Sequence, residues 1–281
     1  MVAIFALAAA VLYGTADFLG GAAARRASAL AVLSVTAPVG EIVVITVALA
    51  AGGPIRLAGF WWGVAGGVAG GAGLIVFYAG LAAGPMTVVA PVAALVSTVL
   101  PVGVAVTSGE RPGPAVVAGA VICLAAITLV SMQGGRPGDG GGRAVRGLGY
   151  GFAAGVAFGL FFLFLRNAGT SGVLWPVGVS RLAGAVIALA AAAVTRTRPV
   201  WWGHDRRTFA MALASGAFDA TANVCYVLAT RAGLFGLAVV ITSLYPGVTV
   251  LLARLTLGER MRSVQRAGLA LAVVGIVLLT A

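Results

Sequence analysis

The sequence contains few charged residues and no lysine. Charged residues make up 9% of the 281 residues, whereas hydrophobic residues make up 61%. Because a soluble domain carries about 25% charged residues, this composition excludes an ordinary soluble protein and indicates an integral membrane protein. All 18 basic residues are arginine, standing singly or in pairs, mostly at the ends of apolar runs. This placement favours a role in membrane topology, and we expect no nucleic-acid partner.

Cysteine and histidine are also scarce. The two cysteines, Cys123 and Cys225, lie inside apolar runs, and we interpret them as packing residues. The sequence shows no His/Cys metal cluster and no serine–base constellation, so we expect no enzyme, no metal and no cofactor. The Gly-rich stretch 134–143 is not followed by Gly-Lys-Ser/Thr, which argues against a nucleotide-driven pump.

Long apolar runs are what the sequence does contain. A membrane-spanning helix needs about 20 apolar residues, and runs of this kind predict an all-α integral membrane fold with ten transmembrane helices. The expected spans are residues 2–23, 29–51, 59–82, 86–107, 113–133, 147–167, 174–195, 208–230, 234–255 and 264–281. We expect residues 134–146 to form a Gly-rich linker between two five-helix domains, residues 1–133 and 147–281.

Two stretches of the sequence are copies of each other. Residues 83–129 align without a gap on residues 232–278 at a shift of 149 residues, and Gly109-Glu110-Arg111 falls on Gly258-Glu259-Arg260. The match indicates an internal duplication. Because five is odd, the second half crosses the membrane with opposite polarity, which predicts two inverted repeats, as in many secondary transporters. We expect the glycine of each turn to end one helix before the next begins.

Glycine recurs every four residues in two of the expected helices. The two sets are Gly59, Gly63, Gly67 and Gly71, and Gly147, Gly151, Gly155 and Gly159. In lipid no hydrophobic force drives helices together, so close backbone approach holds them. The glycines therefore predict helix contact faces, either as static packing or as surfaces between bundles that move.

The first helix carries Tyr13-Gly14-Thr15-Ala16-Asp17-Phe18-Leu19-Gly20-Gly21, the ninth carries Ser243-Leu244-Tyr245-Pro246-Gly247-Val248-Thr249-Val250-Leu251, and both halves share the Gly-Glu-Arg turn. These features resemble the EamA-type transporters of the drug/metabolite transporter superfamily. The resemblance implies a multi-pass protein of the bacterial cell membrane that moves small metabolites or drugs by alternating access, with export as the expected direction. It also implies a central cavity lined by the third, fourth, eighth and ninth helices.

Charged and polar groups at membrane depth are the candidate substrate-binding residues. A charge there costs about 3 kcal/mol or more, so it usually faces a cavity or a partner. The candidates are Tyr13, Asp17, Glu41, Arg181, Asp219, Asn223, Tyr226 and Tyr245. The four charged groups either bind substrate or protons, or form ion pairs with Arg181 as the cation. For the tyrosines, packing between helices is the alternative.

Asp219 and Asn223 are the candidates for which the sequence gives the most specific argument. They are four residues apart and therefore share one helix face. At the shift of 149 residues, Gly70 and Leu74 occupy the matching positions, so the repeat does not require an acid there. We expect Asp219, as a carboxylate without a close cation, to bind substrate or protons, with Asn223 as a neutral contact. The alternative makes Asp219 the structural partner of Arg181.

Two other classes of membrane protein are alternatives to a transporter. A channel or a lipid-handling protein fits the same composition. An intramembrane aspartyl protease would need paired aspartates, and Asp17 and Asp219 are available, but neither stands in Gly-x-Gly-Asp. The expected partners are a small-molecule substrate, protons and the lipid bilayer, and a homodimer is left open.

The orientation in the membrane follows from two arguments that disagree. Most loop arginines follow odd-numbered helices, so the positive-inside rule places both termini outside the cytoplasm. The family resemblance implies that both termini are inside. Either way, an even number of crossings leaves the two termini on one side. Reporter fusions at the two ends should therefore report the same side, and opposite sides would contradict the ten-helix count.

Overall fold

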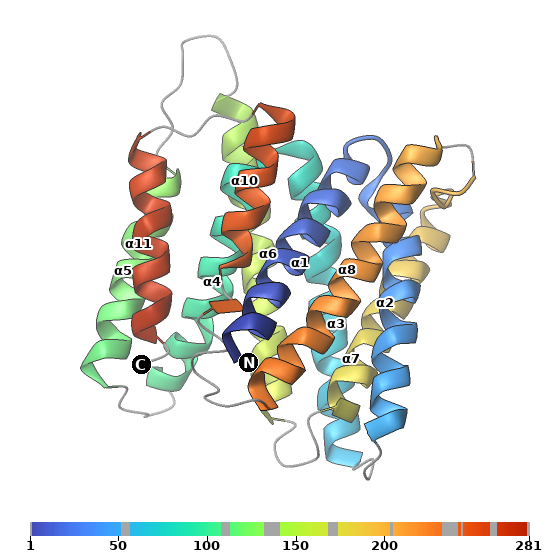
Figure 1. Ribbon diagram of the computed structural model, residues 1–281, viewed down its shortest axis with the longest axis horizontal. Helices are drawn as coiled ribbons and strands as arrows, with labels where there is room; N and C mark the ends of the chain where they lie inside the picture. The colour runs from blue at the N-terminus through green and yellow to red at the C-terminus, as the bar shows by residue number, and fades with distance from the viewer. Residues whose placement is uncertain are drawn as a thin grey trace.

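The computed structural model is a bundle of helices (Figure 1). It describes residues 2–51, 57–107, 113–131, 141–167, 174–202, 205–231, 241–242, 244–258 and 263–279. The helices are α1 (Val2–Ala24), α2 (Ala29–Ala51), α3 (Leu57–Ala83), α4 (Met86–Thr107), α5 (Pro114–Ser131), α6 (Gly141–Asn167), α7 (Leu174–Val194), α8 (Arg206–Arg231), α10 (Tyr245–Leu257) and α11 (Ser263–Leu279). Regular structure is entirely helical in these residues, which confirms the predicted all-α fold.

Five of the described helices are long and apolar enough to span a bilayer. By length and composition, α1, α2, α3, α6 and α7 can each cross a membrane. The helices α4, α10 and α11 contain shorter apolar segments. The apolar helices agree with an integral membrane protein, whereas the count of ten crossings stays a prediction.

Two helix boundaries differ from the expected spans. Helix α6 begins at Gly141, so residues 141–146 of the expected linker are helical, and the Arg146 Nε donates to the Gly142 carbonyl at 3.2 Å. The expected helix 234–255 is described from Tyr245 onward as α10, and residues 232–240 and 243 lie outside the described part of the chain. Proline in the first turn suits a helix start, because its missing N–H needs no partner there.

One Gly-Glu-Arg turn is partly described, at the end of α10. Gly258 adopts a left-handed conformation with φ of 67°, and its N–H bonds to the Ala253 carbonyl. A glycine pays little for this conformation, which ends the helix. The expected role of Gly258 is therefore confirmed. Residues 108–112 and 259–262 lie outside the described residues.

The helix contacts follow a two-fold pattern. Helix α1 packs along α8 as α6 packs along α3, and α1 packs on α10 as α6 packs on α4. Likewise α2 packs on α8 as α7 packs on α3, while α2 meets α7 and α5 meets α11. Each pair maps onto its counterpart when the first five helices are exchanged with the second five. In Figure 1, α1 begins and α11 ends at the same end of the bundle. This is the arrangement of an inverted repeat.

Helices α5 and α11 form a pair at one side of the bundle (Figure 1). Cys123 and Ala126 of α5 pack against Ala272 and Ile276 of α11, with Leu95 of α4 beside them. Cys123 is fully buried and free, so its expected role as a small packing residue holds. The pair leaves the other helices to form the polar centre of the protein.

Several glycines of the two sets lie at close helix contacts. A Cβ atom added at Gly67 of α3 would overlap the Ser180 carbonyl of α7, and one at Gly71 would lie 2.7 Å from the Gly184 Cα. A Cβ atom added at Gly155 of α6 would lie 2.6 Å from the Val96 Cβ of α4. Side chains cannot occupy these positions unless the backbones separate. The glycines therefore set the spacing of α3 from α7 and of α6 from α4.

Leucine at either contact should prevent normal packing. We expect Gly67→Leu and Gly155→Leu to lower the melting temperature and the yield of folded protein, since overpacking costs about 1–3 kcal/mol or more. Gly149→Leu is the matched control on α6, because Gly149 is exposed and a Cβ there meets nothing within 4 Å. Thermal unfolding in detergent measures the difference. Equal melting temperatures for Gly155→Leu and Gly149→Leu would contradict the assigned contact.

Candidate functional site

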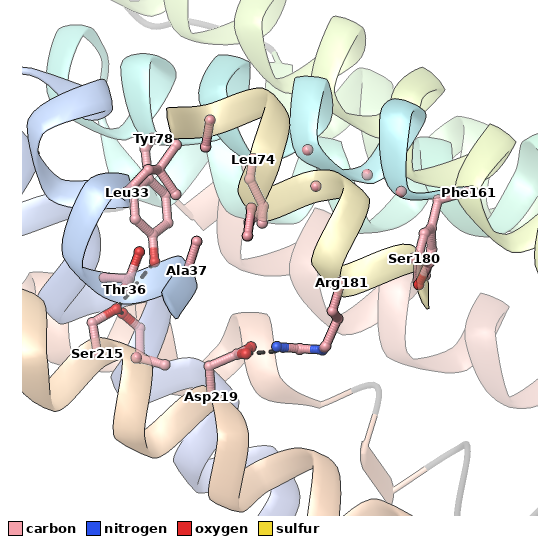
Figure 2. Close-up of a pocket in the computed structure, with 18 of the residues that line it drawn as sticks. Leu33, Thr36, Ala37, Leu74, Tyr78, Phe161, Ser180, Arg181, Ser215 and Asp219 are labelled. Carbon is pink, nitrogen blue, oxygen red and sulfur yellow. Dashed lines mark hydrogen bonds and ion pairs between the residues drawn. The ribbon is translucent and has the colours of Figure 1, made fainter. Parts of the chain in front are cut away.

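A cavity of about 200 Å³ lies in the centre of the helices (Figure 2). Its walls come from α1, α2 and α3 of the first half and from α6, α7 and α8 of the second half. The family resemblance led us to expect the third, fourth, eighth and ninth helices. Helices α3 and α8 do line the cavity, whereas the described residues of α4 and α10 do not contribute to it. Helix α4 packs against α6, and α10 packs against α1.

An ion pair between α7 and α8 crosses the cavity (Figure 2). The Arg181 Nη2 lies 2.7 Å from the Asp219 Oδ2, and the two side chains are 25% and 35% exposed. The expectation that Asp219 lacks a close cation is therefore wrong, and the alternative pairing with Arg181 is the one observed. Gly40 of α2 makes room for the pair, since a Cβ atom there would lie 3.1 Å from the Arg181 Nη1.

Asn223 holds Asp219 and does not line the cavity. Its side-chain amide donates to the Asp219 backbone carbonyl at 2.7 Å and reaches the Asp219 Oδ2 at 3.5 Å. The two residues share a helix face, as their spacing predicts. On that face the amide is directed back along its own helix, which makes Asn223 a positioning residue for the carboxylate.

Asp17 enters the same cavity from α1. Among the described residues, no hydrogen bond or ion pair joins its carboxyl to another group. It interacts electrostatically with Asp219 of α8, and Tyr78 of α3 and Tyr245 of α10 are also within electrostatic range. Asp17 is thus a carboxyl group that faces the cavity without a cation of its own.

Three hydroxyl groups on the cavity wall carry no signal in the sequence. The Tyr78 hydroxyl lies 3.0 Å from the Ser215 Oγ, which donates to the Ala16 carbonyl at 2.8 Å. Because a serine has one hydrogen to donate, Tyr78 is the donor to Ser215. The Thr36 hydroxyl of α2 is buried and has no hydrogen-bond partner within the described part of the chain. Serine, threonine and tyrosine are common in apolar helices, so only their position in the bundle distinguishes these three.

The remaining candidates lie outside the cavity wall. Glu41 of α2 is 7% exposed, and neither carboxyl oxygen has a hydrogen-bond partner, although Arg181 is within electrostatic range. The rings of Tyr13 and Tyr245 are 6.0 Å apart between centroids. Tyr13 also interacts electrostatically with Tyr226 and with both members of the ion pair. Tyr13 therefore lies near the ion pair, and a substrate role for the three tyrosines stays a prediction.

The ion pair breaks the symmetry of the repeat. Gly67 of α3 contacts Ser180 of α7, and Gly216 of α8 contacts Thr36 of α2 in the same way. The shift is 149 residues from Gly67 to Gly216 and 144 residues from Thr36 to Ser180. At these shifts, Asp219 corresponds to Gly70 and Arg181 to Ala37, and both counterparts also line the cavity. The first half therefore leaves space where the second half places charge.

The second half of the chain matches a known family. Residues 145–281 match the EamA-like transporter family. These residues form an EamA-like domain. The resemblance to EamA-type transporters of the drug/metabolite transporter superfamily is thereby confirmed, and with it a multi-pass membrane transporter of this general type. The EamA-like domain contributes Arg181, Ser215 and Asp219 to the cavity, while Asp17 and Thr36 come from the first half.

The comparison with solved structures concerns the fold alone. A chain described as "Crystal structure of protein" shares 20% sequence identity, with a TM-score of 0.65. The alignment covers 99% of this chain and 95% of that chain. The whole bundle therefore has a precedent among solved structures. No curated protein matches the chain.

Removing one member of the ion pair should destabilise the protein. Asp219→Asn strands the Arg181 guanidinium, which costs about 3–5 kcal/mol for a fully buried pair. Because both side chains keep some exposure, we expect a smaller loss of about 2 kcal/mol and a lower melting temperature. The double variant Asp219→Asn with Arg181→Leu should recover most of the loss. Thermal unfolding of the three proteins measures this, and a double variant no better than the single one would contradict a structural pair.

Proposed function

We propose that this EamA-like protein is a secondary transporter that exports a small metabolite or drug by alternating access, driven by protons. The observation that carries this proposal is the cavity between the two inverted halves, with three helices from each. A cavity at a repeat interface is where secondary transporters hold their substrates.

The helix contacts suggest how such a cavity could open on alternate sides. Helices α1, α2 and α8 pack together as one bundle, and α3, α6 and α7 pack together as its counterpart. The cavity lies between these two bundles. The Arg181–Asp219 ion pair and the Tyr78–Ser215 hydrogen bond both join one bundle to the other. Rocking of the bundles about the cavity would break and remake these two ties.

The acids near the cavity support coupling to protons. Asp17 and Glu41 are the two membrane-depth acids without an ion pair among the described residues. An unpaired carboxylate in a medium of low dielectric is costly, so it takes up a proton or a cation. We therefore assign proton exchange to this pair of acids, with Asp219 held in its ion pair by Arg181.

Flux measurements test the proposal. Purified protein reconstituted into vesicles should catalyse saturable uptake of a substrate found by a melting-temperature screen, because binding to the folded state raises stability. Uptake should depend on an imposed pH gradient and fall when an ionophore dissipates it. The cytoplasmic face has to be oriented by protease accessibility to establish export. Flux that rises linearly with concentration and ignores the gradient would indicate a channel instead.

A further inference from the structure

The charges around the cavity do not balance. Among the described residues, three carboxyl groups, those of Asp17, Glu41 and Asp219, face a single guanidinium, that of Arg181. Arg181 is bound by Asp219 and is also within range of Glu41. An anionic group brought to Arg181 would therefore meet two carboxyls already in place. A cationic group brought to Asp17 would meet a favourable charge, because the Asp17 carboxyl lines the cavity with no described cation beside it.

Thr36 supplies a second, independent sign of a ligand. Most described serine and threonine hydroxyls donate to a carbonyl three or four residues earlier, as those of Thr15, Ser34 and Ser180 do. The Thr36 hydroxyl lines the cavity, its side chain is 7% exposed, and it has no partner. A buried hydroxyl without a partner is unfavourable unless a ligand completes its hydrogen bonds.

The rest of the wall is apolar and the space is small. Leu74 and Phe161 line the cavity from α3 and α6 (Figure 2). Phe158 of α6 lines it as well. The volume of about 200 Å³ lies below the ~300–1,000 Å³ of sites for drug-sized ligands. The occupant is therefore a small molecule with an apolar part.

We propose that the cavity binds a small organic ammonium ion, with its ammonium group on the Asp17 carboxylate and the Thr36 hydroxyl and its carbon skeleton against Phe158 and Phe161. The biological purpose of such binding rests on the proposed transport function, whereas the binding site is inferred from the residues that line the cavity. The ion pair explains the selectivity. The Arg181 guanidinium is already bound by the Asp219 carboxylate. An amino acid would therefore find a partner for its ammonium group but none for its carboxylate. The cavity therefore prefers an amine to the corresponding amino acid or carboxylic acid.

Binding of matched probes to the full-length purified protein tests the charge preference. One series is 2-phenylethylamine, phenylalanine and 3-phenylpropionate, and a second is isopentylamine, leucine and 4-methylpentanoate. Calorimetric titration in detergent should show binding by at least one of the two amines, more than about tenfold tighter than its zwitterionic and anionic counterparts. Failure of both amines to bind, or equal affinity across a series, would overturn the proposal.

Two variants assign the site to its residues. Asp17→Asn should weaken amine binding at least about tenfold, since a charge-assisted hydrogen bond is lost. Thr36→Val should weaken it about fivefold without lowering the melting temperature of the ligand-free protein, because the hydroxyl has no partner there. Asp205→Asn is the matched control, since Asp205 is an exposed acid paired with Arg26 outside the cavity. Unchanged affinity in Asp17→Asn, or an equal loss in Asp205→Asn, would overturn the assignment.

A third variant tests the role of the ion pair in selectivity. Asp219→Asn frees Arg181 and should allow binding of 3-phenylpropionate, which the unmodified protein rejects. The Asp17 measurements decide the proposal if this variant does not fold. Binding in detergent requires no flux, so a negative result here leaves the proposed transport standing. Conversely, amine binding without flux in vesicles would contradict transport and leave the site intact.

Discussion

Close contact between helix backbones is the constraint on which this structure depends. Lipid tails are as apolar as leucine side chains, so burial alone gives two membrane helices no reason to associate. Gly67 on α3 and Gly216 on α8 solve this at equivalent places, each against a backbone carbonyl of the neighbouring helix. The contacts define two three-helix bundles related by the repeat, and the space between the bundles is the cavity.

Polar groups collect in that space because exposure to lipid would leave them without partners. An unpaired charge facing lipid is costly, whereas a charge facing a cavity can meet a partner, a proton or a ligand. Arg181 and Asp219 form an ion pair between the two bundles, and Tyr78 and Ser215 form a hydrogen bond between them. These polar contacts are fewer and more directional than the glycine contacts. They are therefore suited to exchange while the packing within each bundle is kept.

The duplication supplies the scaffold and the differences between the halves supply the chemistry. Gly70 and Ala37 stand in the first half where Asp219 and Arg181 stand in the second, and all four positions face the cavity. Asp17 adds an acid from the first half at a place where the repeat has no counterpart charge. A symmetric frame thus encloses an asymmetric set of charges.

The sequence by itself determined the helical membrane fold, the duplication, the glycine contacts and the small set of charges that could reach a cavity. These follow from composition and spacing, because apolar runs and buried charges are conspicuous along the chain. Only the tertiary structure decided that Arg181 pairs with Asp219, that Asn223 turns back on its own helix, and that Thr36 is without a partner. The helices are apolar on all sides, so periodicity does not mark an inward face. Which side chains meet depends on the neighbours and rotation of each helix, and packing across the whole bundle sets both.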